Sequence, residues 1–103
     1  MPAGVFNNTG LGASEIAVTT TQKTILTVPL VMTAPQGQMD FLKRSTGDTI
    51  YIGLCGKKAS AANYDIILTD AIPFYDIQGI AVGDISAVST AGGIVSITIY
   101  ACI

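Results

Sequence analysis

The side chains best able to do chemistry in this chain are four aspartates in its second half, Asp65, Asp70, Asp76 and Asp84. Two carboxylates brought together by folding could act as a general acid and base, or could bind calcium through their oxygens. Aspartates at strand ends more commonly accept hydrogen bonds from the amides of turns. Asp48 and Asp84, each just before a predicted strand, fit that role. We therefore predict that the carboxylates have structural roles.

The chain contains no histidine, which excludes imidazole metal ligands and histidine-based acid–base or nucleophilic catalysis. Its two cysteines, Cys55 and Cys102, do not have the spacing of a metal site, and no phosphate-binding or serine-nucleophile motif is present. Because each cysteine lies at the end of a predicted strand, we interpret both as small buried thiols. We predict that the protein is not an enzyme and has no cofactor or metal site.

Aromatic side chains are the other candidates for a binding site. Tyr51, Tyr64, Tyr75 and Tyr100, together with Phe74, could form a platform for a sugar ring, because tyrosine combines contact area with a polar tip. Tyrosines on strands more often pack in cores or interfaces, and the chain has no tryptophan. Phe74, Tyr75 and Tyr100 are the candidate ligand-facing residues if the protein is a carbohydrate-binding module.

The composition favours assembly with other subunits. Only 12% of the 103 residues are charged, against about 25% in an ordinary soluble domain, and so small a domain is marginally stable alone. We therefore expect a homo-oligomer, the alternative being a monomer with a Thr-, Ser- and Gly-rich surface. The net charge of −2 gives no basic field for nucleic acid, and we interpret Lys43–Arg44 and Lys57–Lys58 as solvated strand ends.

The sequence carries no apolar run of about 20 residues, and its N-terminus lacks the charged and apolar regions of a signal peptide. We expect no membrane partner, and we expect the chain to be made in the cytoplasm without export by a signal peptide.

Short strands separated by turn residues must position all of these side chains. Alternating apolar residues and Val-, Ile- and Thr-rich segments predict strands at 14–20, 23–32, 38–45, 49–54, 64–69, 73–77, 84–89 and 92–100. The turn Thr46-Gly-Asp48 predicts a hairpin between the third and fourth. Ile50, Ile52 and Leu54 share one face, as do Val95, Ile97, Ile99 and Ala101 in the last strand. Residues 14–103 thus predict an all-β fold, a single small antiparallel β-sandwich or jelly-roll-like domain.

Residues 1–13 read as an extended N-terminal arm, because glycine, proline and asparagine dominate them. Val5, Phe6 and Leu11 are its only large apolar side chains, and we expect them to dock on a neighbouring subunit. The alternative is an arm that folds back on its own domain.

The segment from about Thr21 to Ala101 resembles small all-β virion proteins of tailed bacteriophages. The motifs that carry the resemblance are Phe41-Leu-Lys-Arg-Ser-Thr-Gly-Asp-Thr-Ile-Tyr-Ile-Gly53, Asp84-Ile-Ser-Ala-Val-Ser89 and Ala91-Gly-Gly-Ile-Val-Ser-Ile-Thr-Ile-Tyr100. The resemblance implies a capsid decoration (cement) protein, a head fibre or collar piece, or a component of the tail.

We therefore expect a structural virion protein on the capsid exterior, made in the host cytoplasm. Its partners would be the major capsid protein or other virion proteins, with the arm and the sheets bridging neighbouring capsid subunits. The alternatives are a tail, fibre or collar component and, from a different class, a carbohydrate-binding module.

Overall fold

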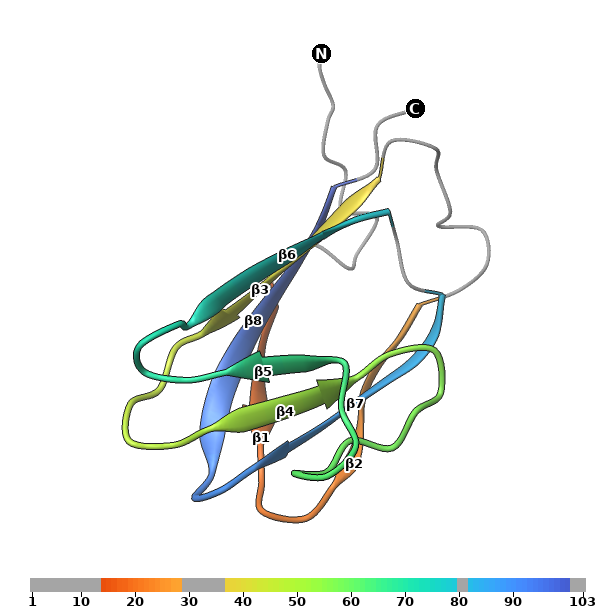
Figure 1. The fold of residues 1–103 in the computed structure, drawn as a ribbon. Helices are drawn as coiled ribbons and strands as arrows, with labels where there is room; N and C mark the ends of the chain where they lie inside the picture. The colour runs from red at the N-terminus through yellow and green to blue at the C-terminus, as the bar shows by residue number, and fades with distance from the viewer. Residues whose placement is uncertain (1–13, 29–36, 80–81, 101–103) are drawn as a thin grey trace.

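The computed structural model describes residues 14–28, 37–79 and 82–100, and this part of the chain consists of strands, turns and loops (Figure 1). Apart from the second strand, whose predicted end lies outside the described residues, the predicted strands begin and end within two residues of those observed. In chain order these are β1 (Ser14–Val18), β2 (Lys23–Val28), β3 (Gln38–Lys43), β4 (Ile50–Gly53), β5 (Ile66–Leu68), β6 (Phe74–Gln78), β7 (Gly83–Ser89) and β8 (Gly93–Tyr100).

The strands form two four-stranded antiparallel sheets. The first sheet has the order β1-β8-β3-β6, and the second has the order β2-β7-β4-β5. The chain moves to the opposite sheet at most connections, and β4 and β5 are the only consecutive strands that pair with each other in the described part of the chain. Two facing sheets with this strand order form a jelly roll. The predicted fold class is confirmed.

The predicted hairpin across Thr46-Gly-Asp48 is wrong. β3 pairs with β8 and β6, whereas β4 pairs with β7 and β5, so the turn between them crosses from one sheet to the other. Both strands are central in their sheets and use both edges for other partners. A glycine-containing turn of this length suits a sheet-to-sheet corner as well as a hairpin, and the sequence of the turn does not distinguish the two.

The core lies between the sheets and follows the predicted alternation. Val95, Ile97 and Ile99 of β8 have no exposed surface, and the last two sit opposite the core residues Phe41 and Met39 of β3 in the ladder. The second sheet contributes Ile50 and Ile52, also without exposed surface. The predicted core faces of both strands are therefore confirmed as far as they are described; Ala101 lies outside the described residues.

The connection from β4 to β5 crosses the outer face of the second sheet. Ser86 faces away from the core, yet it is buried, because its hydroxyl donates to the Lys57 carbonyl at 2.6 Å and accepts from the Ala59 amide at 2.8 Å. A side chain at Gly53, opposite Ser86 in the ladder, would collide with the Lys57 carbonyl. Glycine is thus required where the connection leaves the sheet.

Candidate functional site

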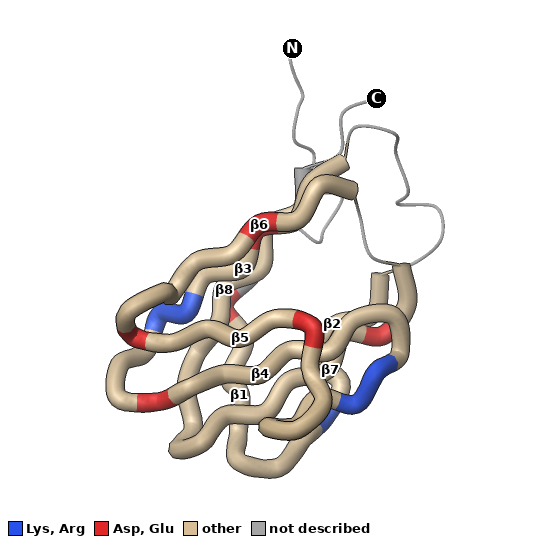
Figure 2. Tube along the Cα trace, in the orientation of Figure 1, with Lys and Arg blue, Asp and Glu red and all other residues tan. Residues whose placement is uncertain are grey.

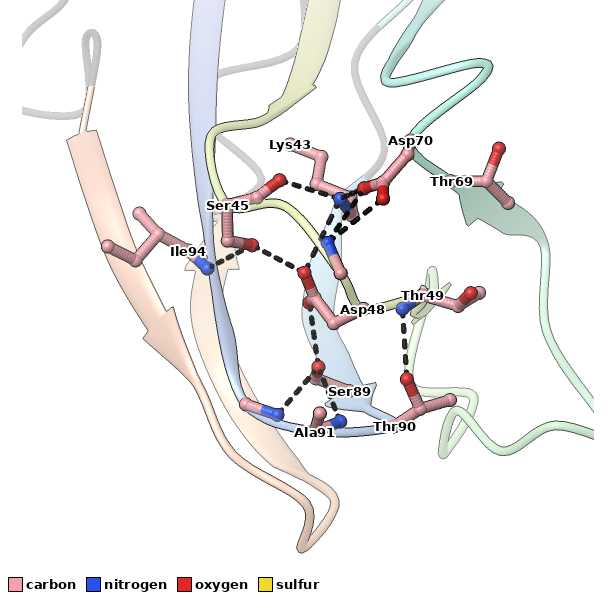
Figure 3. Close-up of polar contacts among 12 residues, drawn as sticks. Lys43, Ser45, Asp48, Thr49, Thr69, Asp70, Ser89, Thr90, Ala91 and Ile94 are labelled. Atoms are coloured by element: carbon pink, nitrogen blue, oxygen red, sulfur yellow. Dashed lines mark hydrogen bonds and ion pairs between the residues drawn. The ribbon is translucent and has the colours of Figure 1, made fainter.

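Three turns meet in a buried polar cluster at one end of the sandwich (Figure 3). Lys43, at the end of β3, donates from Nζ to the Ser45 carbonyl at 2.6 Å and to the Asp70 carboxylate, and lies 3.4 Å from Asp48 Oδ1. Asp48 accepts hydrogen bonds of 2.8 Å from the hydroxyls of Ser45 and Ser89. The cluster therefore joins the β3–β4, β5–β6 and β7–β8 turns.

Electrostatics hold this cluster in its charged form. Burial alone would lower the pKa of the Lys43 ammonium, but its hydrogen bonds to Asp70 and Asp48 and their negative charges raise it above its ordinary value. Burial would raise the pKa of Asp48, yet hydrogen bonds from Ser89, Ser45 and Lys43 outweigh it and lower the pKa. The Lys43 hydrogen bond and the Gly47 amide also lower the pKa of Asp70.

This arrangement is better suited to holding the three turns together than to acid–base catalysis. Because the pKa values of both carboxyl groups are lowered, Asp48 and Asp70 stay ionised at neutral pH, so neither can donate a proton there. Among the described residues, every fully buried side-chain nitrogen and oxygen has a hydrogen-bond partner. Lys43 is only 5% exposed, so its interpretation as a solvated strand end is wrong. A deeply buried ammonium needs paired carboxylates, and sequence spacing did not reveal them.

The other candidate carboxylates bind local partners. Asp65 accepts from Lys57 Nζ at 2.9 Å and from the Leu54 amide at 2.8 Å, and these two bonds lower its pKa. Asp84 accepts from the Thr27 hydroxyl at 2.8 Å, across the β2–β7 ladder. These bonds agree with the predicted structural roles. In the described part of the chain, no three Asp, Glu, Cys or His side chains gather closely enough to hold a metal ion.

Asp76 on β6 lies opposite Asp40 on β3 in the ladder of the first sheet. Two carboxylates directly across a ladder repel each other. The Gln38 side-chain amide donates to Asp40 at 2.8 Å and so compensates part of that repulsion.

Cys55 differs from its interpretation as a buried thiol. Cys55 is exposed, lies in the turn after β4, and has a φ of 56°, which is uncommon for a residue other than glycine. The apolar alternation of β4 continues toward this position, but the strand ends at Gly53 because the chain turns back over the sheet. Cys102 lies outside the described residues.

The predicted ligand-facing aromatics do not share one surface. Phe74 and Tyr75 are consecutive on β6 and therefore point to opposite faces of the first sheet, with exposed fractions of 48% and 46%. The backbone of Tyr100 pairs with Gln38, and its side chain lies outside the described part of the structure. Their role in ligand binding stays a prediction. The arm residues Val5, Phe6 and Leu11 also lie outside the described residues.

Exposed apolar side chains also occur along β5, β6 and the turn between them, where the outer strands of the two sheets approach each other (Figure 1). Ile67 is on β5, Ile72 is 65% exposed in the following turn, and Phe74 and Tyr75 begin β6. We call these four residues, which lie along this edge but do not all point to one face, the β5–β6 edge patch. Both strands are terminal in their sheets, so each has an edge without a ladder partner in the described structure.

A second feature, missed by the sequence reasoning, is a groove of about 440 Å³ on the outer face of the second sheet. Its lining includes Thr20, Gln22, Tyr51, Ala59, Val88 and Thr90, and we call it the tyrosine groove. Tyr51 lies opposite Val88 in the ladder, and its ring centroid is 5.2 Å from that of Tyr64. The groove lies over β4 and β7 between three separate loops, and local sequence carries no signal that these segments meet.

No protein-family model, no curated protein and no solved structure matches this chain. Function must therefore be argued from the two surfaces and the polar cluster. The described residues include no helix long and apolar enough to cross a membrane. In the view of Figure 2, Lys and Arg of the described chain lie in two separated regions, one at the left and one at the lower right.

Proposed function

We propose that this protein is a structural virion component, a capsid decoration protein that binds the outer head surface and stabilises contacts between major capsid subunits. The observation that carries the proposal is the β5–β6 edge patch. Scattered single apolar residues are normal on a surface, but four exposed ones within the short β5–β6 segment, beside two sheet edges without ladder partners in the described structure, favour a protein–protein contact. The phage assignment itself rests on the resemblance of the sequence motifs.

Two further features agree with an assembly role. Jelly rolls form viral capsid domains as well as lectin domains, although a shared fold alone does not establish a function. The buried Lys43 cluster joins three turns at one end of the sandwich, which would keep a contact surface in shape without any partner.

Copy number on the particle tests the decoration role. Quantitative mass spectrometry of purified virions should find the chain in numbers comparable to the capsid subunits, because a cement protein repeats with the shell. A handful of copies per particle would reject the decoration role and favour a tail, fibre or collar component.

A binding assay with heads that lack the protein tests the surface. Phe74→Ser and Ile72→Ser should each weaken attachment by about 1–2 kcal/mol, or about 5- to 30-fold in Kd, because each removes apolar area from the contact. Ile94→Ser is the matched control, since Ile94 is also exposed, at 40%, but lies on β8 opposite Ala17 of β1. Equal loss in all three variants, or none, would contradict the assigned surface.

A further inference from the structure

We propose that the tyrosine groove is a binding site for a neutral saccharide. This inference goes beyond the proposed assembly function and does not depend on it. Of the aromatic residues expected from the sequence to form a sugar platform, the groove contains Tyr51 on the second sheet, whereas the three candidate ligand-facing residues, Phe74, Tyr75 and Tyr100, belong to the first sheet.

The chemistry of the lining identifies the class of ligand. None of the described residues that line the groove is charged, and they combine hydroxyl and amide groups with Tyr51, Val88 and alanines. Such a surface offers nothing to neutralise a phosphate, a carboxylate or an ammonium group. A saccharide presents what this surface can bind, namely apolar C–H faces for an aromatic ring and hydroxyls for polar groups.

Several polar groups at the groove are not committed to the fold. The side chains of Thr20 and Gln22 make no hydrogen bond to another described residue. Thr90 accepts from the Thr49 amide at 3.0 Å and Ser60 accepts from the Ala62 amide at 3.3 Å, which leaves the proton of each hydroxyl available. These donors and acceptors surround Tyr51, where they could bind the hydroxyls of a sugar.

Hydrogen bonds and ring packing within the protein hold the walls of the groove. The turn that carries Thr20 is held by the hydrogen bond from the Ser89 amide to the Thr19 carbonyl, 2.9 Å long. On the other side, Ser86 holds the buried Ala59 in position, and the Tyr64 ring packs against Tyr51 at a tilt of 46°. A rigid site loses less entropy when it binds, which favours recognition by few contacts.

An extended peptide fits these observations less well. Peptides that add to a sheet bind along an exposed strand edge through backbone hydrogen bonds. The groove instead lies over β4 and β7, which are both central strands of the second sheet. Their backbone N–H and C=O groups already pair with neighbouring strands on both sides.

The test begins with a glycan array probed with the labelled full-length chain. The array should carry bacterial O-chains and capsular polysaccharides, animal glycans and, as a rival class, uncharged polar peptides. We expect neutral glycans to bind above the blank, and the pattern of positive spots separates bacterial from animal sources. Binding to no glycan, or tighter binding to the peptides, would overturn the proposal.

The strongest glycan is then titrated into ¹⁵N-labelled protein. Amide shifts should change at Thr20, Gln22 and Val88, and Gln22→Ala should weaken binding about 3- to 10-fold through the loss of one hydrogen-bonding side chain. Tyr51→Leu should weaken it further, and Tyr75→Leu, the same change outside the groove, should leave it unchanged. Shifts centred on β6, or unchanged affinity in both groove variants, would reject this site.

Gln22→Ala also separates the two proposals. Because its side chain contacts no described hydrogen-bond partner, the variant should fold normally and attach to heads as well as the unmodified protein does. Loss of glycan binding with intact attachment would support the groove whatever the outcome for the β5–β6 edge patch.

Discussion

Replacing Asp48 by asparagine should strongly destabilise the protein while barely changing the size of the side chain. Oδ1 of Asp48 accepts from Ser45, and Oδ2 accepts from Ser89, each at 2.8 Å. Both serine oxygens are already acceptors themselves, Ser45 from the Ile94 amide and Ser89 from the Ala91 and Gly92 amides. An asparagine NH₂ group would therefore point a further donor at one of these oxygens and leave that serine hydroxyl without an acceptor.

The magnitude follows from burial. The Asp48 side chain is 1% exposed, and a buried hydrogen bond to a charged group contributes about 1.5–3 kcal/mol. The buried Lys43 ammonium also loses one of its two carboxylate neighbours, although it keeps Asp70 and the Ser45 carbonyl. We expect a loss of about 3 kcal/mol, a large share of the about 5–15 kcal/mol that stabilises a typical domain.

Urea unfolding followed by circular dichroism measures this loss. With a slope of about 2 kcal/mol per molar urea, the midpoint should fall by about 1.5 M. Asp70→Asn is the matched control: it removes the other carboxylate of Lys43, but at a side chain that is 55% exposed, so it should lower the urea midpoint by clearly less than Asp48→Asn does. If Asp48→Asn lowers the free energy of unfolding by less than about 1 kcal/mol, or by no more than the control does, the buried cluster does not hold the turns together as argued.

Three other predictions concern pH and packing. The pKa values of Asp48, Asp65 and Asp70 are lower in the folded state than in the unfolded state, so these ionised carboxylates stabilise the fold fully above the unfolded pKa of about 4. This stabilisation is lost as pH falls through the folded pKa values, and the urea midpoint should therefore drop between about pH 5 and about pH 2. A constant midpoint over this range would contradict the prediction. Gly93→Ala would place Cβ against the Asp48 carboxylate and the Ser45 hydroxyl. Thermal unfolding should therefore show a loss of about 2 kcal/mol or more in the free energy of unfolding. An unchanged melting temperature would mean that these side chains can move aside. Ile97→Asp puts an unpaired charge at a fully buried position and should abolish folding; a dispersed amide spectrum from a soluble variant would show that this face is not the core.

The positions of the strands could be predicted because each strand shows its two faces in its own sequence. Ile97 and Ile99 alternate with Ser96 and Thr98, and the buried and outward positions of β8 follow that pattern. The partners of each strand could not be predicted in this way. Thr46-Gly-Asp48 is as suitable for a sheet-to-sheet corner as for a hairpin, because ladder partners are distant in sequence.

The candidate sites were harder to predict from the sequence than the fold was. The aromatic residues were identified, but their grouping was not: Tyr51 and Tyr64 meet only because the β4–β5 connection folds over the second sheet. Lys43 looked like a solvated charge because nothing adjacent in the chain showed that Asp48 and Asp70 would enclose its ammonium. Cys55 looked buried because alternation does not show where a strand ends.

By itself, then, the sequence determined that this chain is an all-β domain with known core faces, since alternation and turn residues act locally. The tertiary structure alone decided that the strands form a jelly roll, that a lysine is buried at one end, and that residues from separate loops form the tyrosine groove. These features depend on contacts between residues far apart in the chain. Their energies come from burial and charge pairing, which exist only after the two sheets have packed together.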